Sequence, residues 1–264
     1  MFTFDGARRY TMPAHFGALE GEPEASVYAD VTAVVLRYET DGAALARYVP
    51  EGFELTEPVL EVAYQASYGV EWMAGGHYNL LGVTAPVAWI AGAERLHGQF
   101  ALVVWENDAT AIFAGREQLG IPKVFADVED LHQLGDRRFA TLSHGGAPFL
   151  ELDIRLTRRF GPEELATHNR EQGRLTWFGF RYVPNVGRPG AALSHATVVP
   201  VENEFHEAWS CEGSVRWQVP AWERNPTQLP ILRALAGLPV GGVRGCVMTR
   251  GRGVLRSDAA RPLP

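Results

Sequence analysis

Residues 26–38, SVYADVTAVVLRY, carry the pattern that decides the fold class. The segment is rich in Val and Tyr, and its apolar residues alternate with polar ones or run together, as in a β-strand with one or both faces buried. Further segments have the same character: 59–69, 99–107, 110–117, 123–129, 138–144, 149–156, 175–183, 192–201, 214–219 and 243–249. Short polar or Gly/Pro turns separate them, so the sequence predicts a high content of β-sheet.

Helical patterns are few. The segments 40–50, 161–173 and 226–237 each carry an N-terminal capping residue or proline and stop at a proline or glycine, which predicts short helices there. Strands do not alternate with helices, so a doubly wound parallel sheet is not expected. We expect a mainly β (α+β) fold, an antiparallel sheet or closed β-barrel with a few covering helices, as a single domain over residues 1–264.

Composition argues against several classes of protein. The net charge of −7 and the pI near 5.6 do not suit a nucleic-acid or anionic-membrane surface, since such partners require a basic stripe. The basic segment TRGRGVLR (249–256) is interpreted as a solvated hairpin. The longest apolar run, 80–93, is shorter than the ~20 residues that span a bilayer. With no visible secretory pattern, we expect a cytoplasmic protein in which Cys211 and Cys246 stay reduced.

Common catalytic and cofactor motifs are missing from the sequence. There is no G-x-S-x-G, no phosphate-binding loop, no H-E-x-x-H and no C-x-x-C, and the eight histidines are scattered. We therefore expect no metal and no cofactor. The expected partner is a small molecule, with neither nucleic acid nor membrane involved.

The composition hides a single lysine. Of the 24 Lys and Arg residues, only Lys123 is a lysine, and it follows Pro122 in the apolar context GIPKVFA. Alternation along a strand gives it apolar neighbours on either face. Burial without a partner favours the neutral amine, which attacks carbonyl groups, whereas a guanidinium stays charged. Lys123 is therefore a candidate nucleophile. The alternative is a nucleotide composition that favours Arg codons and leaves one lysine on the surface.

The segment around this lysine resembles a known family. GREQLGIPK (115–123) is similar to the G-R-E-[LI]-x-x-[YF]-P-K segment of acetoacetate decarboxylase, in which the lysine after proline forms a Schiff base. Further segments resemble the family in the same order along the chain: DGAALARYVPEGFELTEPVLEV (41–62), RYVPNVGRPG (181–190) and HEAW (206–209). The resemblance covers residues 30–245.

The resemblance implies a fold, an assembly and roles for several residues. It implies a closed β-barrel or cone with helices packed outside, often in a homo-oligomer, and a Schiff base at Lys123. Arg116 and Glu117 match the motif, and their implied role is to orient the strand or the substrate. A structural ion pair is the alternative for these two residues.

Four positions depart from the family pattern. Val124 stands where the decarboxylase has a second lysine, and Val31 aligns where an arginine is implied. Gln118 replaces a Leu or Ile, and Ile121 replaces an aromatic residue. Without the second cation, the site loses a partner for the carboxylate of a β-keto acid.

These departures favour carbon–carbon chemistry on a small 2-oxo acid of the pyruvate type. In this hypothesis Lys123 forms an enamine that adds to an aldehyde, as in an aldolase or aldolase-dehydratase. Gln118 would hydrogen-bond the substrate's carboxylate or hydroxyl, and Tyr78 would transfer protons. Ile121 and Trp72 would line the pocket, with core packing as the alternative for Trp72. Two other functions stay open: decarboxylation of a β-keto acid such as acetoacetate, or a related hydratase or cyclase step, and a non-catalytic small-molecule binding barrel.

Overall fold

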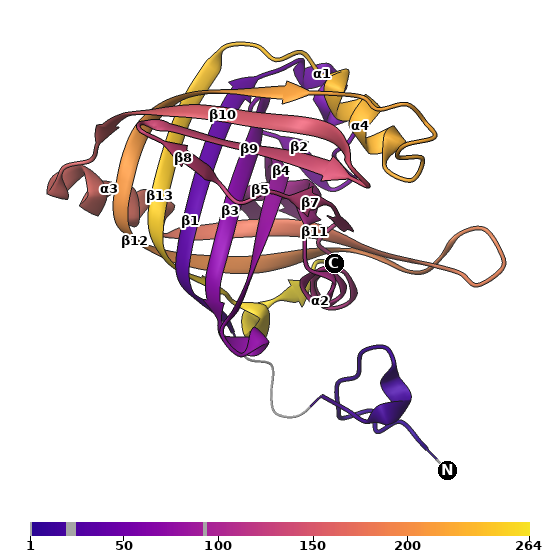
Figure 1. Cartoon of the computed structure of the whole chain (residues 1–264). Coiled ribbons are helices and arrows are strands. Elements are labelled where there is room, and N and C mark those ends of the chain that lie inside the picture. The colour runs from indigo at the N-terminus through magenta and orange to yellow at the C-terminus, as the bar shows by residue number, and fades with distance from the viewer. Residues whose placement is uncertain (1, 20–24, 92–93) are drawn as a thin grey trace.

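The computed structural model describes residues 2–19, 25–91 and 94–264. Its strands belong to one large mixed sheet, which is accompanied by a few helices (Figure 1). The strands are β1 Ser26–Glu39, β2 Phe53–Leu55, β3 Val59–Val70, β4 Gly76–Ala91, β5 Glu94–Glu106, β6 Lys123–Phe125, β7 Asp127–Val128, β8 His132–Leu134, β9 Arg137–His144, β10 Ala147–Arg159, β11 Arg174–Pro184, β12 Ala191–Trp217, β13 Val243–Leu255 and β14 Arg261–Pro262. The α-helices are α1 Gly42–Ala46, α2 Ala109–Leu119, α3 Pro162–Gln172 and α4 Leu229–Ala236. Short 3-10 turns lie at η1 Ala14–Phe16, η2 Glu71–Met73 and η3 Ser257–Ala259. The predicted mainly β fold with few helices is confirmed.

Part of the sheet closes into a ring. Its strands follow the order β11–β5–β4–β3–β1–β13–β12, and β12 pairs back onto β11. Neighbours in the ring are antiparallel, except at β11–β5, where Trp177 and Phe178 pair in parallel with Gln99 and Phe100. The far half of β12 extends beyond the ring and pairs with β10, which leads on to β9 and β7. The ring encloses the candidate active site.

Strand β4 shows why the run 80–93 lacks alternation. Leu80 packs in one hydrophobic cluster with Tyr78, whereas its neighbour Leu81 packs in another with Trp105. Because both faces of the strand are covered, both sets of side chains are apolar. Residues 92–93 of this run lie outside the described residues.

Helices pack at the ends of the sheet. In Figure 1, α1 and α4 lie near one end and α2 near the other. Helix α4 buries Leu229, Leu232 and Leu235, and the indole of fully buried Trp105 donates a 2.9 Å hydrogen bond to Gln228 just before that helix. The three helices predicted from the sequence are confirmed as α1, α3 and α4.

Some local predictions are wrong. Residues 110–117 are helical rather than extended, because Asp108 caps α2 by accepting hydrogen bonds from the backbone N–H of Thr110 at 2.8 Å and Ala111 at 3.0 Å. The basic segment 249–256 is not a hairpin: most of it continues β13 between β1 and β12.

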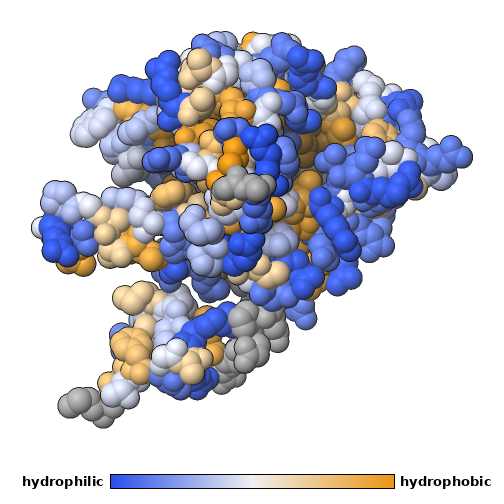
Figure 2. Space-filling view, turned by 180° about the vertical axis from the view of Figure 1, so that it is seen from behind, coloured by the Kyte–Doolittle hydropathy of each residue, from blue (hydrophilic) through white to orange (hydrophobic). Residues whose placement is uncertain are grey.

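The surface seen from behind is mostly hydrophilic, and apolar residues show mainly in recesses between the elements (Figure 2). Residues 2–19 stand apart from the main body in Figure 1. They contact it where the Thr11 hydroxyl donates a hydrogen bond to Glu117. Among the described helices, none has the length and apolar character needed to cross a membrane.

Candidate active site

Helix α2 and the turn after it deliver Lys123 to the ring. The helix ends at Gly120, which adopts a left-handed conformation with φ 70°. A side chain could not fit there, since a Cβ on Gly120 would lie 2.8 Å from the backbone nitrogen of Arg181. The chain then turns back, and Lys123 begins β6, which runs parallel to the end of β5.

The Lys123 side chain folds back over α2. Its Nζ donates a 3.1 Å hydrogen bond to the carbonyl oxygen of Ala111 and lies 2.8 Å from Oε1 of Glu106. Only 11% of the side chain is exposed. Gly115 makes this path possible, because a Cβ there would overlap Cδ and Cε of Lys123 and lie 2.8 Å from Nζ. The amine is therefore held by a helix carbonyl and a carboxylate.

Glu106 is the last residue of β5, and its side chain is fully buried. Within the described part of the chain, neither carboxylate oxygen accepts a hydrogen bond from any group other than Lys123. Burial raises the pKa of the Glu106 carboxyl, and the charge of Lys123 opposes this shift. A buried carboxyl with a raised pKa and a specific charge partner is typical of a functional site. The sequence-based premise that Lys123 is buried agrees with the structure, but the premise that burial acts there without a charged partner is wrong, because Glu106 pairs with it.

A small pocket lies inside the ring beside this pair. Its volume is about 80 Å³, well above the ~10–15 Å³ that one water requires. Every strand of the ring contributes to its wall. The lining residues are Tyr28, Val31, Gln65, Tyr78, Leu80, Val104, Glu106, Leu119, Ile121, Lys123, Trp177, Val201, Asn203, Gly253, Val254 and Leu255.

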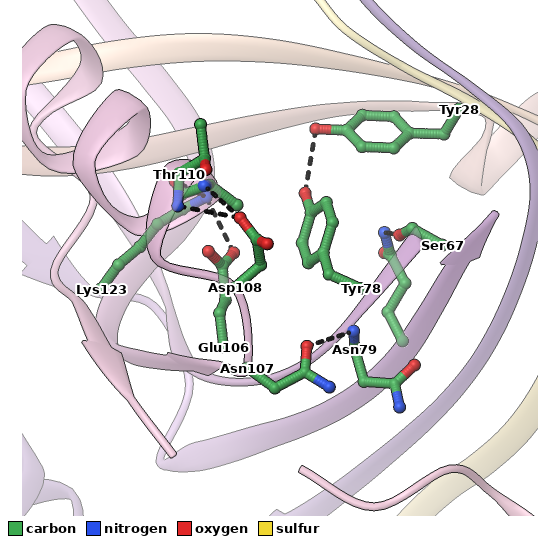
Figure 3. Close-up of polar contacts among 11 residues, drawn as sticks. Tyr28, Ser67, Tyr78, Asn79, Glu106, Asn107, Asp108, Thr110 and Lys123 are labelled. Atoms are coloured by element: carbon green, nitrogen blue, oxygen red, sulfur yellow. Dashed lines mark hydrogen bonds and ion pairs between the residues drawn. The ribbon is translucent and has the colours of Figure 1, made fainter. Parts of the chain in front are cut away.

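Two tyrosines contribute hydroxyls to the wall of the pocket. The hydroxyl of Tyr78 donates a 3.2 Å hydrogen bond to the hydroxyl of Tyr28, and Figure 3 shows the two hydroxyls facing each other. Burial raises the pKa of both tyrosines, and the nearby carboxylate of Glu106 adds to each shift. Both hydroxyls therefore stay protonated at neutral pH and can donate hydrogen bonds.

The structure brings together only some of the residues singled out from the sequence. Lys123, Tyr78 and Ile121 all line the pocket. Gln118 is exposed on α2 and is not among the lining residues. Trp72 is 39% exposed in η2 and is not among the residues that line the pocket.

Arg116 and Glu117 do not form an ion pair with each other. The guanidinium of Arg116 donates a 2.7 Å hydrogen bond to the backbone carbonyl of Lys123. Arg116 is not among the residues that line the pocket. Glu117 accepts the hydrogen bond from Thr11. Arg116 therefore contacts the backbone of the strand that carries Lys123.

Val31 and Val124, which stand where the family pattern has an arginine and a lysine, have different surroundings. Val31 lines the pocket, so an apolar side chain occupies the wall where the family resemblance implies an arginine. Val124 pairs with Trp105 of β5 and packs against the main core, away from the pocket.

Sequence reasoning missed the residue closest to the amine. Glu106 directly follows the apolar run QFALVVW. A charged residue in that position, next to a strand expected to be buried, was a signal from which a site residue could have been predicted. Tyr28, Gln65 and Asn203 were also missed. They come from distant strands, so nothing in the local sequence indicated that they meet. In the described ranges, no cluster of three or more His, Cys, Asp or Glu side chains could hold a metal ion.

The family model of acetoacetate decarboxylase matches residues 11–245. An acetoacetate decarboxylase from Burkholderia vietnamiensis is 29% identical over 149 residues, which cover 52% of this chain and 58% of that protein. The aligned part thus spans little more than half the length of this curated relative.

Solved structures share the fold over nearly the whole chain. Acetoacetate decarboxylase from Legionella pneumophila has a TM-score of 0.75 at 18% identity, covering 94% of this chain and 91% of that one. The enduracididine biosynthesis enzyme MppR in complex with pyruvate has a TM-score of 0.70 at 15% identity, covering 97% of both chains. A second MppR structure holds the condensation product of pyruvate and imidazole 4-carboxaldehyde, with a TM-score of 0.70, 16% identity, and coverage of 96% and 95%.

Proposed function

Because this chain belongs to the acetoacetate decarboxylase family, we propose that it is a lyase that forms a Schiff base between Lys123 and a small carbonyl compound. The observation that carries the proposal is the position of the amine. Nζ of Lys123 lies beside a small internal pocket and 2.8 Å from a buried carboxylate. Once it has lost its proton, a primary amine in this position is the group that condenses with a ketone or aldehyde.

The ion pair supplies the proton transfers for condensation. The ammonium of Lys123 first gives a proton to the carboxylate of Glu106, which leaves a neutral amine and a neutral acid. The amine nitrogen attacks the carbonyl carbon, and the resulting carbinolamine carries a hydroxyl. That hydroxyl takes the proton back from Glu106 and leaves as water, so the products are an iminium and a carboxylate. The pair begins and ends with one positive and one negative charge.

The iminium then acts as an electron sink. The carboxylate of Glu106 takes a proton from the adjacent carbon, which gives an enamine that can add to the carbonyl carbon of an aldehyde. Tyr78 is the proposed proton donor to the new alkoxide, since its hydroxyl is protonated and lines the pocket, and the protonated Glu106 then returns a proton to the Tyr78 oxygen. Arg116 is a positioning residue in this scheme, because it contacts only the backbone of Lys123 in the site. Gln118 has no role in it.

Two reactions are candidates for this Schiff base. An aldolase or aldolase-dehydratase reaction, with a 2-oxo acid of the pyruvate type as the donor expected from the sequence, has the support of the fold shared with MppR, whose structures hold pyruvate and a condensation product. Decarboxylation of a β-keto acid such as acetoacetate has the support of the family model and the Burkholderia relative. Val31 favours the first, since an apolar side chain lines the pocket there and no second cation is among the described lining residues.

Trapping of the Schiff base tests the proposal. The protein is incubated with a panel of small ketones, aldehydes and oxo acids, reduced with cyanoborohydride, and digested for mass spectrometry. The expected result is an adduct on the peptide that contains Lys123. Lys123→Arg is the control, because it keeps a cation beside Glu106 but has no amine that can react. If no compound in the panel gives an adduct, the chain is a non-catalytic binding protein instead.

Evolution of CO₂ from acetoacetate separates the two reactions. We expect none above the level of Lys123→Arg, and CO₂ release that depends on Lys123 would favour decarboxylation. The homo-oligomeric state and the cytoplasmic location expected from the sequence stay predictions, and light scattering on the purified protein would test the first.

A further inference from the structure

We propose that the compound which reacts with Lys123 is an uncharged ketone or aldehyde rather than an oxo acid. This inference rests on the proposed Schiff-base function and departs from the sequence-based expectation only in the charge of the substrate. It comes from counting the charges that surround the pocket. Of the sixteen residues that line it, Glu106 and Lys123 carry charge, and they are paired at 2.8 Å.

The Lys123 charge is already neutralised in the resting site. No arginine or histidine is among the lining residues, and Val31 provides an apolar wall. The carboxylate of Glu106 is fully buried and receives no hydrogen bond from elsewhere in the part of the chain that the structure describes. Lys123 is therefore the cation that compensates the charge of the Glu106 carboxylate. The net charge of the pocket is close to zero because these two charges cancel.

An oxo acid would upset this balance. The Schiff base carries one positive charge, so a bound pyruvate or acetoacetate would leave two carboxylates to share one cation. An unpaired carboxylate in a buried site is strongly disfavoured, because it has lost its hydration without gaining a partner. The site could avoid that cost only by protonating Glu106. An uncharged carbonyl compound, in contrast, keeps the net charge of the Lys123 and Glu106 pair at zero at every stage of condensation.

The other polar groups of the pocket suit an uncharged substrate. Tyr28 and Tyr78 offer hydroxyls, and Gln65 and Asn203 offer side-chain amides. These groups can bind a hydroxyl or a second carbonyl oxygen without a charge on either partner. Leucine, isoleucine and valine side chains and the Trp177 ring form the rest of the wall, where the carbon skeleton would lie. A hydroxyketone or an ester of a keto acid fits this combination.

Matched pairs of substrates test the inference. The first pair is hydroxyacetone and pyruvate, in which a hydroxymethyl group replaces the carboxylate. The second pair is methyl acetoacetate and acetoacetate, in which an ester replaces the carboxylate. The rate of cyanoborohydride trapping on Lys123 is measured for each and divided by the rate for a small free amine under the same conditions. We expect the uncharged member of each pair to react at least about tenfold faster in the wild type, as the cost of an unpaired buried carboxylate implies.

Glu106→Gln is the decisive variant. It removes the resident negative charge, so the preference for the uncharged member should fall or reverse. Glu163→Gln is the matched control, because it makes the same change at an exposed residue of α3, and it should keep the wild-type preference. If Glu106→Gln does not fold by circular dichroism, the wild-type comparison alone decides.

The possible outcomes separate this inference from the proposed function. Equal or faster trapping of pyruvate and acetoacetate in the wild type overturns the inference and leaves the Schiff-base proposal intact. No adduct with any of the four compounds, or with the wider panel, overturns the Schiff-base proposal itself.

Discussion

Oε1 of Glu106 lies 2.8 Å from Nζ of Lys123, although seventeen positions separate the two residues in the chain. The parallel pairing of β6 with the end of β5 brings their backbones side by side, and α2 lies between them in sequence. This ion pair affects both the chemistry of the site and the stability of the fold, because removing one of the two side chains leaves the other buried without an oppositely charged partner. The predictions below test this relationship and the structure that supports it.

Lys123→Met should destabilise the protein in a pH-dependent way. Breaking a buried pair by removing one partner costs about 3–5 kcal/mol. Burial raises the pKa of Glu106, and losing the opposing charge of Lys123 raises it further. With the folded pKa above the unfolded one, stability is lost as pH rises through the folded pKa and is regained at acid pH. We expect a larger loss of unfolding free energy at pH 8 than at pH 5, measured by urea denaturation.

The double variant Lys123→Met/Glu106→Gln is the control for that experiment. It has no buried carboxylate, so its loss of stability should be smaller than that of Lys123→Met at pH 8 and nearly independent of pH. An equal loss in the single variant at both pH values would mean that Glu106 is not the group left unpaired.

Gly115→Ala should impair trapping at Lys123 without unfolding the protein. The added methyl group would overlap Cδ and Cε of Lys123, and the flexible lysine can move away from it. Alanine is the better helix former by about 1 kcal/mol, so the unfolding free energy should stay close to that of the wild type. We expect the trapping rate to fall by about tenfold or more, since displacement of a reacting atom by ~1 Å is costly.

Ala114→Gly is the matched control in the same helix. It should lower stability by about 1 kcal/mol through helix propensity and leave the trapping rate unchanged. A Gly115→Ala protein that traps substrates at the wild-type rate would show that the path of Lys123 over α2 is not required.

Thr197→Val should loosen the end of α2. The buried hydroxyl of Thr197 donates a 2.6 Å hydrogen bond to the carbonyl oxygen of Leu119, the last residue of that helix. Valine has the same shape but no donor, so we expect a loss of about 1–3 kcal/mol for the unsatisfied carbonyl. Thr197→Ser keeps the hydroxyl and should lose less. Chemical denaturation of both variants checks the order, and the reverse order would contradict it.

The two cysteines should differ sharply in reactivity. The interaction between the two thiols, together with burial, raises the pKa of Cys246, while the same interaction lowers the pKa of Cys211. Because the thiolate is the reactive form, iodoacetamide at pH 8 should label half-buried Cys211 first and Cys246 only after unfolding. Mass spectrometry of the labelled peptides gives both rates, and Cys211→Ser gives the background. Equal labelling of both thiols in the folded protein would contradict this ordering.

The sequence predicted the fold class well where local patterns suffice. Period-2 segments such as 26–38 became strands, because one face of each is buried and β-branched and aromatic residues suit a pleated surface. Segment 110–117 has similar composition yet forms part of α2. There the Asp108 cap and the packing of Ala111, Gly115 and Leu119 into the interior outweigh the β-propensity of Thr, Ile and Phe.

By itself, the sequence determined which residue can supply an amine, since Lys123 is the single lysine of the chain and lies in the family motif. Only the tertiary structure decided what surrounds that amine. The ring brings Glu106, Tyr28 and Tyr78 to it from separate strands and turns Gln118 to the solvent. Chemical identity is a property of a residue, whereas charge pairing, burial and proton transfer depend on distances that only the folded chain sets.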